Sequence, residues 1–267
     1  MGELNRDIDV DPNWKQPMIT INGGPYVYMD HLLTDEDARA LDEEITFGLA
    51  RTDDTILSVG REYSRGDAAP EFYNHDYKDV QHAEKELTPE ERTKLRLAGF
   101  KYKEYHKYLK YAKGAYHPWS HAYMVMNSDW LDQQTGEGKV IKDEAKRLFP
   151  KLIKWCYDLP IFKEIGRISI FGVDVNQHIT VHRDFDPRKL KDDHHLLMVS
   201  PRGAKKSFTF DQEKNEKHYV NSKCYIFHDL NFHGVDPSPF WTYNFRIDGT
   251  YTDEFAASLE YNRSWEN

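Results

Sequence analysis

Apolar residues in the first part of the chain recur at the spacing of a helix. Ala38, Leu41, Ile45 and Leu49 would share one helix face, with polar and charged residues between them. Thr34 precedes this run and is followed by three acidic residues, as is typical of a helix N-cap at the positive end of the helix dipole. The pattern therefore predicts a helix that begins after Thr34 and buries one apolar face.

Two more helices are predicted further along the chain. The segment Thr88–Glu91 combines a capping Thr, a Pro at the first helical position and a Glu at the third, so we expect a helix from there to about Ala112. Leu148 and Leu152 belong to a third run at helical spacing. Residues 51–87, which are polar and punctuated by Gly and Pro, are predicted to form loops.

From about Gly166 the chain changes to short β-rich runs separated by turn signals. The runs are Arg167–Val175, His178–Asp184, His194–Val199, Ser207–Phe210, Cys224–Phe227 and Trp241–Ile247. Closely spaced strands of this kind favour a sandwich or a barrel. We therefore predict a single domain of mainly β structure with flanking helices (α+β). Residues 1–165 would give helical and loop support, residues 166–250 the β core and residues 251–267 a tail.

Composition and charge narrow the range of partners. The 267 residues carry a formal net charge of −9, which argues against a protein that coats nucleic acid, because phosphate contacts need a basic face. Segment 101–113 alternates lysine with tyrosine, but it more simply predicts an amphipathic helix with buried rings and solvated lysines. We expect a small-molecule or peptide substrate and no nucleic-acid partner.

The sequence predicts neither a membrane protein nor a secreted one. No apolar run approaches the roughly 20 residues that cross a bilayer, and the first residues are polar and lack the apolar stretch of a signal peptide. Cys156 and Cys224 do not make a disulfide framework. We therefore expect a reducing, cytoplasmic location.

Three segments of the β-rich half carry the residues of a possible metal and cosubstrate site. His182 and Asp184 stand two residues apart, His233 follows far downstream, and Arg246 comes last. Because side chains alternate along a strand, Thr180 would share a face with His182 and Asp184. Two imidazoles and one carboxylate can occupy one face of an Fe(II) ion and leave the opposite face open. An arginine nearby can pair bidentately with the far carboxylate of a dicarboxylic cosubstrate.

In these residues the chain resembles the Fe(II)/2-oxoglutarate-dependent oxygenases. The resemblance covers roughly the last hundred residues and implies that His182, Asp184 and His233 are the ligands of Fe(II). It implies that Arg246 holds the C5 carboxylate of 2-oxoglutarate, with O₂ as a further cosubstrate. It also implies a double-stranded β-helix, a jelly-roll or cupin-like core, with the preceding helices packed against the outside of one sheet.

The expected cosubstrate pocket leaves alternatives open. Asn244 and Thr180 are candidates for additional contacts to 2-oxoglutarate, since each shares a strand face with a residue of the expected site. Arg246 could instead form a structural salt bridge to Asp184, Asp248 or another acid. Many family members carry Ser or Thr at the position of Asp248. That residue is expected either to face solvent near the barrel mouth or to leave part of the anchoring to Asn244 or Thr180.

Other histidines compete for roles in the site. His228 is the alternative to His233 as third ligand, and we prefer His233 because its spacing to Arg246 matches the family. The resemblance also implies that the strand beginning at His194 and His195 lies near the cosubstrate.

The resemblance implies a dioxygenase that couples substrate hydroxylation to decarboxylation of 2-oxoglutarate to succinate and CO₂. Asp184 favours hydroxylation, because halogenases of the family replace this carboxylate by a small residue. Segments Phe149–Leu152 and Asn176–Ile179 resemble aspartyl/asparaginyl β-hydroxylases, so we expect an amino-acid side chain, free or in a peptide, as substrate. The alternatives are a Zn(II) hydrolase on the same ligands, a non-catalytic jelly-roll binding module and an oxygenase that acts on nucleobases.

Overall fold

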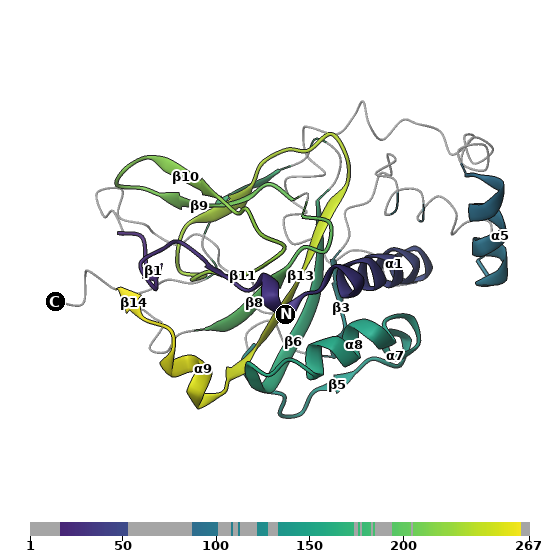
Figure 1. The fold of residues 1–267 in the computed structure, drawn as a ribbon, viewed down its shortest axis with the longest axis horizontal. Helices are drawn as coiled ribbons and strands as arrows, with labels where there is room; N and C mark the ends of the chain where they lie inside the picture. The colour runs from purple at the N-terminus through teal and green to yellow at the C-terminus, as the bar shows by residue number, and fades with distance from the viewer. Residues whose placement is uncertain are drawn as a thin grey trace, which may run out of the picture.

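The computed structural model is mostly β with a few helices (Figure 1). It describes residues 17–52, 87–100, 108, 112, 122–127, 133–173, 176, 178–182, 184, 194–203 and 205–262.

Two antiparallel sheets form the centre of the described structure. The large sheet has the order β2 (Val27–Tyr28), β11 (Cys224–Ile226), β8 (His195–Val199), β13 (Thr242–Tyr251), β6 (Phe162–Val173) and β3 (Ala122–Met124). The small sheet has the order β10 (Glu216–Tyr219), β9 (Ser207–Asp211), β12 (His233–Val235) and β7 (Ile179–His182). Figure 1 shows β9 and β10 on one side of the molecule, apart from the long strands β6 and β13.

The chain alternates between these two sheets as it runs from β6 to β13. Strands β6, β8, β11 and β13 lie in the large sheet, whereas β7, β9, β10 and β12 lie in the small one. This winding is a double-stranded β-helix, the jelly-roll arrangement of eight strands. The strand order alone therefore confirms the predicted fold class.

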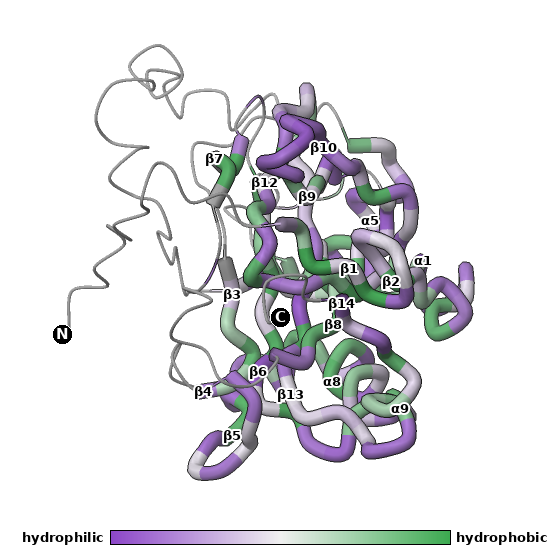
Figure 2. Tube along the Cα trace, turned by 90° about the vertical axis from the view of Figure 1, so that its left-hand side faces the viewer, coloured by the Kyte–Doolittle hydropathy of each residue, from purple (hydrophilic) through white to green (hydrophobic). Residues whose placement is uncertain are grey.

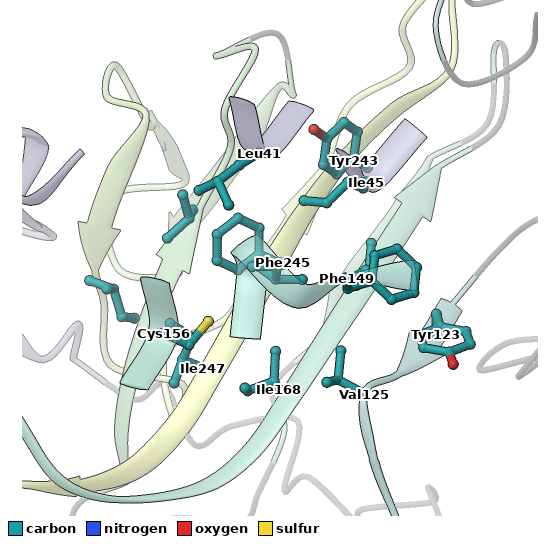
Figure 3. Close-up of a cluster of buried hydrophobic side chains, with 14 of the residues drawn as sticks. Leu41, Ile45, Tyr123, Val125, Phe149, Cys156, Ile168, Tyr243, Phe245 and Ile247 are labelled. Carbon is teal, nitrogen blue, oxygen red and sulfur yellow. The ribbon is translucent and has the colours of Figure 1, made fainter. Parts of the chain in front are cut away.

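Helices α1 (Asp35–Arg51), α7 (Asp143–Leu148) and α8 (Pro150–Tyr157) cover the outer face of the large sheet. Helix α1 begins as predicted, since the Thr34 side chain accepts a hydrogen bond from the Asp37 amide. Figure 3 shows the core between these helices and the large sheet, where Leu41 and Ile45 of α1 lie next to Phe245 of β13, and Cys156 of α8 lies next to Ile247. The expected packing of helices against one sheet is confirmed.

Smaller elements tie the ends of the chain together. Strand β1 (Thr20–Ile21) pairs with β14 (Tyr261–Asn262), and α9 (Asp253–Ala257) leads into β14. A short 3-10 helix η1 (Asp30–Leu32) precedes α1, and β4 (Met126–Asn127) pairs with β5 (Val140–Ile141). The predicted tail thus contains the last residue of β13, a helix and a strand.

The helix that starts at Thr88 does not continue to Ala112. Helix α5 (Pro89–Leu97) has the predicted capping box, but it ends with Gly99 at φ 75° and with the Phe100 amide bonded to the Leu95 carbonyl. A glycine in the left-handed region is a common helix stop. Gly99 was thus a stop signal within the predicted helix.

Strand limits also differ from the prediction. Strand β6 begins at Phe162, before the expected boundary, and β13 continues past Ile247 to Tyr251. Strands β10 and β12 were not predicted. Strand β10 is polar, as its purple colour in Figure 2 shows, and its side chains are largely exposed, so it lacks an apolar face.

Among the described residues, no helix is long and apolar enough to cross a membrane. Cys156 and Cys224 are both buried and are not joined by a disulfide.

Candidate functional site

Strand β13 places three polar side chains inside the barrel. Asn244, Arg246 and Asp248 are 2%, 5% and 0% exposed. They share one face because side chains alternate along a strand. Phe245 and Ile247, between them, point into the core beneath the helices. The predicted alternation along this strand is confirmed.

Arg246 is held by three carboxylates. Its Nε donates to Asp248 Oδ1 at 2.6 Å, its Nη1 to Asp184 Oδ2 at 2.7 Å, and its Nη2 to Asp229 Oδ2 at 2.8 Å. Nη2 also lies 3.3 Å from the Gln133 side-chain oxygen. Burial by itself would lower the pKa of Arg246, but the three acids raise it above its ordinary value. The salt bridges that the sequence analysis named as the alternative role of Arg246 are present.

Asp248 is fully buried and does not face solvent, which corrects one expectation for this residue. It accepts from Arg246 through one oxygen and from Arg167 through the other, at 2.7 Å. Arg167 lies opposite Asp248 on the neighbouring strand β6. Burial lowers the pKa of Arg167, and Asp248 opposes that effect. A Ser or Thr could not neutralise two buried guanidinium groups, which gives a physical reason for the carboxylate here.

Asp229 is a site residue that the sequence analysis missed. It is 0% exposed, and its Oδ2 lies 3.2 Å from His194 Nδ1 as well as next to Arg246. Burial raises the pKa of Asp229, but His194 and Arg246 outweigh it and the net shift is downward. His195 instead stacks on Tyr251, with ring centroids 4.3 Å apart. The available signal was an acid directly after the β-rich run Cys224–Phe227, between His228 and Leu230.

The structure brings two of the three expected metal ligands together and places the backbone of the third beside them. His233 Nε2 lies 3.6 Å from Asp184 Oδ1. His182 is the register partner of His233 across β7 and β12. The side chains of His182 and Thr180 lie outside the described residues. Among the described side chains, no three His, Cys, Asp or Glu residues form a metal-binding group. Because the His182 side chain is not among them, that finding does not bear on a set that includes His182.

Gly234 allows β12 to approach its neighbours at this point. A Cβ atom there would lie 2.8 Å from the Ile179 carbonyl oxygen of β7 and 2.9 Å from the Phe208 ring of β9. Only a residue without a side chain fits such spacing. The glycine after His233 therefore keeps β12 close to the strand that carries His182.

The arrangement of His233 and Asp184 fits a cation. His233 Nδ1 donates to the Asn231 carbonyl at 2.8 Å, which in a neutral ring puts the lone pair on Nε2, facing the Asp184 carboxylate. A histidine that ligates a metal commonly has such a second bond from its other nitrogen. Burial by itself lowers the pKa of His233, but Asp184 raises it above the ordinary value. A proton or a metal ion between the two side chains would satisfy both.

His228 lies in a different setting. It is 3% exposed, its Nδ1 accepts from the Leu230 amide at 3.3 Å, and its ring packs edge-on against Tyr261. Burial lowers its pKa to about 4. His233 is the register partner of His182 across β7 and β12, and His228 is not.

Lys205 is a third buried cation at this site, besides Arg167 and Arg246, and it was not among the residues predicted from the sequence. It lies just before β9 and is 8% exposed, with Nζ donating to Asn244 Oδ1 at 2.7 Å. Burial lowers the pKa of Lys205 to about 7. No sequence signal marks this residue among the other lysines; the fold alone brings it beside Asn244.

Solved structures similar to this chain include iron oxygenases and a cupin. One is an oxidoreductase of the 2OG-Fe(II) oxygenase family from Burkholderia pseudomallei, 10% identical, with a TM-score of 0.32 over 48% of this chain and 67% of that one. Another is a viral collagen prolyl hydroxylase from Paramecium bursaria Chlorella virus-1, 14% identical, with a TM-score of 0.30 over 48% and 77%. A cupin protein from Desulfovibrio desulfuricans is 14% identical, with a TM-score of 0.23 over 34% and 74%.

The sequence matches no protein-family model, and no curated protein has a matching sequence. The fold assignment accordingly rests on the strand order within the two sheets.

Proposed function

We propose that this protein is a non-haem Fe(II)/2-oxoglutarate-dependent oxygenase. The single observation that best supports it is the meeting of Asp184, His233 and Arg246 inside a double-stranded β-helix, with His182 opposite His233 in register. We further propose that it hydroxylates an amino-acid side chain, free or in a peptide, while converting 2-oxoglutarate to succinate and CO₂. The substrate class rests on the sequence resemblance.

In this proposal His182, Asp184 and His233 hold Fe(II). Two imidazoles and one carboxylate are the donor set that non-haem Fe(II) oxygenases use, and they leave open positions for cosubstrates. When bound, the iron supplies the redox chemistry that links O₂ to the decarboxylation. Ligand donors about 2.1 Å from one metal lie about 3–4 Å apart, and the His233 Nε2 to Asp184 Oδ1 distance of 3.6 Å is compatible with that range.

The charges around the ligands suit a dianionic cosubstrate. Arg167 and Arg246 are matched against Asp184, Asp229 and Asp248, so the cluster carries one excess negative charge when the histidines are neutral. A bound divalent ion reverses that excess to positive. An anion such as 2-oxoglutarate would then be attracted more strongly to the metal-loaded protein.

The protein's own residues hold the proposed ligands in place. Arg246 donates hydrogen bonds to Asp184 through Nη1 and to Asp229 through Nη2. Asp229 is also hydrogen-bonded to His194. The Phe227 ring packs edge-on against His233 at 5.0 Å. Leu196, Met198, Tyr225 and Phe227 line an apolar part of the interior. These contacts favour a fixed orientation of the proposed ligands.

Anaerobic reconstitution with Fe(II) tests the proposed ligands. We expect wild type to bind about one equivalent of iron, and His233→Gln to lose most of it, since three protein donors are needed to hold this ion. His228→Gln is the matched control, because it alters a nearby buried histidine that the proposal leaves out. Iron retained by His233→Gln but lost by His228→Gln would contradict the assignment. Succinate that forms only with O₂, iron and 2-oxoglutarate would support the oxygenase, and turnover without O₂ and 2-oxoglutarate would favour the hydrolase.

A further inference from the structure

Lys205 is an ammonium group enclosed by the barrel without an acidic partner among the described residues. Its Nζ donates to Asn244 Oδ1 at 2.7 Å and approaches the Phe171 carbonyl at 3.4 Å, and both of these acceptors are neutral. Burial lowers its pKa, and within the part of the chain that the structure describes no carboxylate counteracts this effect. A buried charge without a counter-charge is costly, so an arriving anion would be strongly favoured there.

Polar groups around Lys205 form a built site. Ser207, Tyr225 and Asn244 are 9%, 3% and 2% exposed. Ser207 and Asn244 both hydrogen-bond to the Tyr225 hydroxyl. We call Lys205, Ser207, Tyr225 and Asn244 the lysine cluster. It combines one cation with hydroxyl and amide groups, which is the chemistry that binds a carboxylate.

Arg246 is poorly placed to receive the same carboxylate. Its guanidinium already donates to Asp184, Asp229 and Asp248. An incoming carboxylate would have to displace one of them and leave it buried beside another anion. Arg246 also contacts the proposed metal ligand Asp184 directly, so it lies beside the metal site and not at the far end of a chelating cosubstrate.

The lysine cluster adjoins Arg246 on the same face of strand β13, because its member Asn244 is the next residue along that face. Asn244 and Arg246 are two residues apart on β13, which corresponds to about 6–7 Å. In 2-oxoglutarate the keto carbon and the far carboxyl carbon are three single bonds apart, about 4 Å when extended. With a metal–oxygen bond of about 2 Å added, this span is close to the distance between Arg246 and Asn244, so a cosubstrate chelated at a metal beside Arg246 is long enough to reach Asn244 and Lys205.

We infer that the lysine cluster is the subsite for the far carboxylate of the cosubstrate, and that Arg246 is a positioning residue that orients Asp184. This inference rests on the proposed function. It moves the anchoring role that the sequence resemblance gives to Arg246 onto Lys205, and it keeps Asn244 as a contact.

Binding of two 2-oxo acids separates the two roles. Titration calorimetry with Mn(II), which binds the same donors without redox turnover, would compare 2-oxoglutarate with 2-oxopentanoate, which lacks the far carboxylate. We expect wild type to prefer 2-oxoglutarate by about ten- to hundredfold, the range of one charge-assisted hydrogen bond. Lys205→Met should remove this preference and leave the affinities for 2-oxopentanoate and Mn(II) unchanged. Lys205→Gln serves as a second variant if the first does not fold.

Arg246 variants give the opposite pattern if it positions Asp184. Arg246→Met should weaken Mn(II) binding and both 2-oxo acids by a similar factor, and Arg246→Lys should restore part of the metal affinity. A preference for 2-oxoglutarate that survives in both Lys205 variants and disappears in Arg246→Met would overturn the inference. Wild type that binds neither 2-oxo acid with Mn(II) would instead remove the proposed function, and this inference with it.

Discussion

The carboxylate of Asp248 balances two guanidinium groups in a place that water does not reach. Arg167 and Arg246 each donate to one of its oxygens, and Asp248 is 0% exposed. Replacing one partner of a buried ion pair leaves charge without compensation. The cluster therefore depends on Asp248 more than on any exposed acid of the chain.

Asp248→Asn should lower the free energy of unfolding by about 3–5 kcal/mol, because the amide keeps the size of the side chain but removes its charge. Urea denaturation of both proteins measures the difference. Asp253→Asn is the control: it breaks an exposed pair with Lys163 and should cost about 1 kcal/mol or less. Equal losses in the two variants would argue against a buried charge cluster.

His228 makes stability depend on pH. Its pKa is about 4 in the folded protein because burial disfavours the charged ring, against an ordinary value near 6.5. Between these values the unfolded chain binds more protons than the folded one, so stability falls as the pH drops through this window. At pH 5 the loss relative to pH 7 should be about 2 kcal/mol from this residue.

Urea denaturation of wild type and His228→Gln at pH 7 and pH 5 isolates this effect. The variant should lack that part of the decrease, whatever its stability at pH 7. A decrease of the same size in both proteins would show that His228 titrates normally.

At the scale of single residues, spacing along the sequence predicted some site positions and missed others. His233 and Arg246 stand in a recognisable order with Asp184, and the structure brings these three together. Lys205 and Asp229 have no such partners in sequence. They join the site because β9, β11 and β13 fold against one another, which no local pattern encodes.

At the scale of elements, Gly48 determines how closely helix α1 packs on the joint between α7 and α8. A Cβ at Gly48 would lie 2.2 Å from the Phe149 ring. In an exposed helix, Gly to Ala stabilises by about 1 kcal/mol. Here the added methyl group meets a ring that is itself fully buried.

Gly48→Ala should therefore destabilise the protein by about 1–3 kcal/mol through overpacking. Thermal or urea denaturation measures it. Phe149→Leu shortens the ring side chain, so the same substitution in that background should cost less, with a coupling of about 0.5–3 kcal/mol. A neutral or stabilising Gly48→Ala in wild type would show that α1 can shift without loss.

Elements with a strong pattern were predicted well. The cap at Thr34 and the apolar stripe of α1 fix that helix. The alternation of polar and apolar residues on β13 predicted which side chains face the barrel interior and which face the helices. Strand β12 could not be predicted because it has three residues and a glycine at its centre. Its pairing with β7 and β9 is a tertiary effect.

At the scale of the whole molecule, the jelly roll gathers residues from distant parts of the sequence. Asp184 follows β7, Asp229 follows β11 and Arg246 lies on β13, yet one guanidinium bonds both acids. The short β-rich runs after Gly166 predicted a β core, and the strand order established how it winds. The charge balance of the interior could be read only after folding, because it depends on which acids meet which bases.

Anaerobic titration with Fe(II) and 2-oxoglutarate tests the central claim most directly, through the weak visible metal-to-ligand charge-transfer band that the resemblance implies. The account predicts a band that needs both iron and 2-oxoglutarate in wild type and is lost in His182→Ala. Absence of the band from folded, iron-loaded wild type, or its persistence in His182→Ala, would contradict the account.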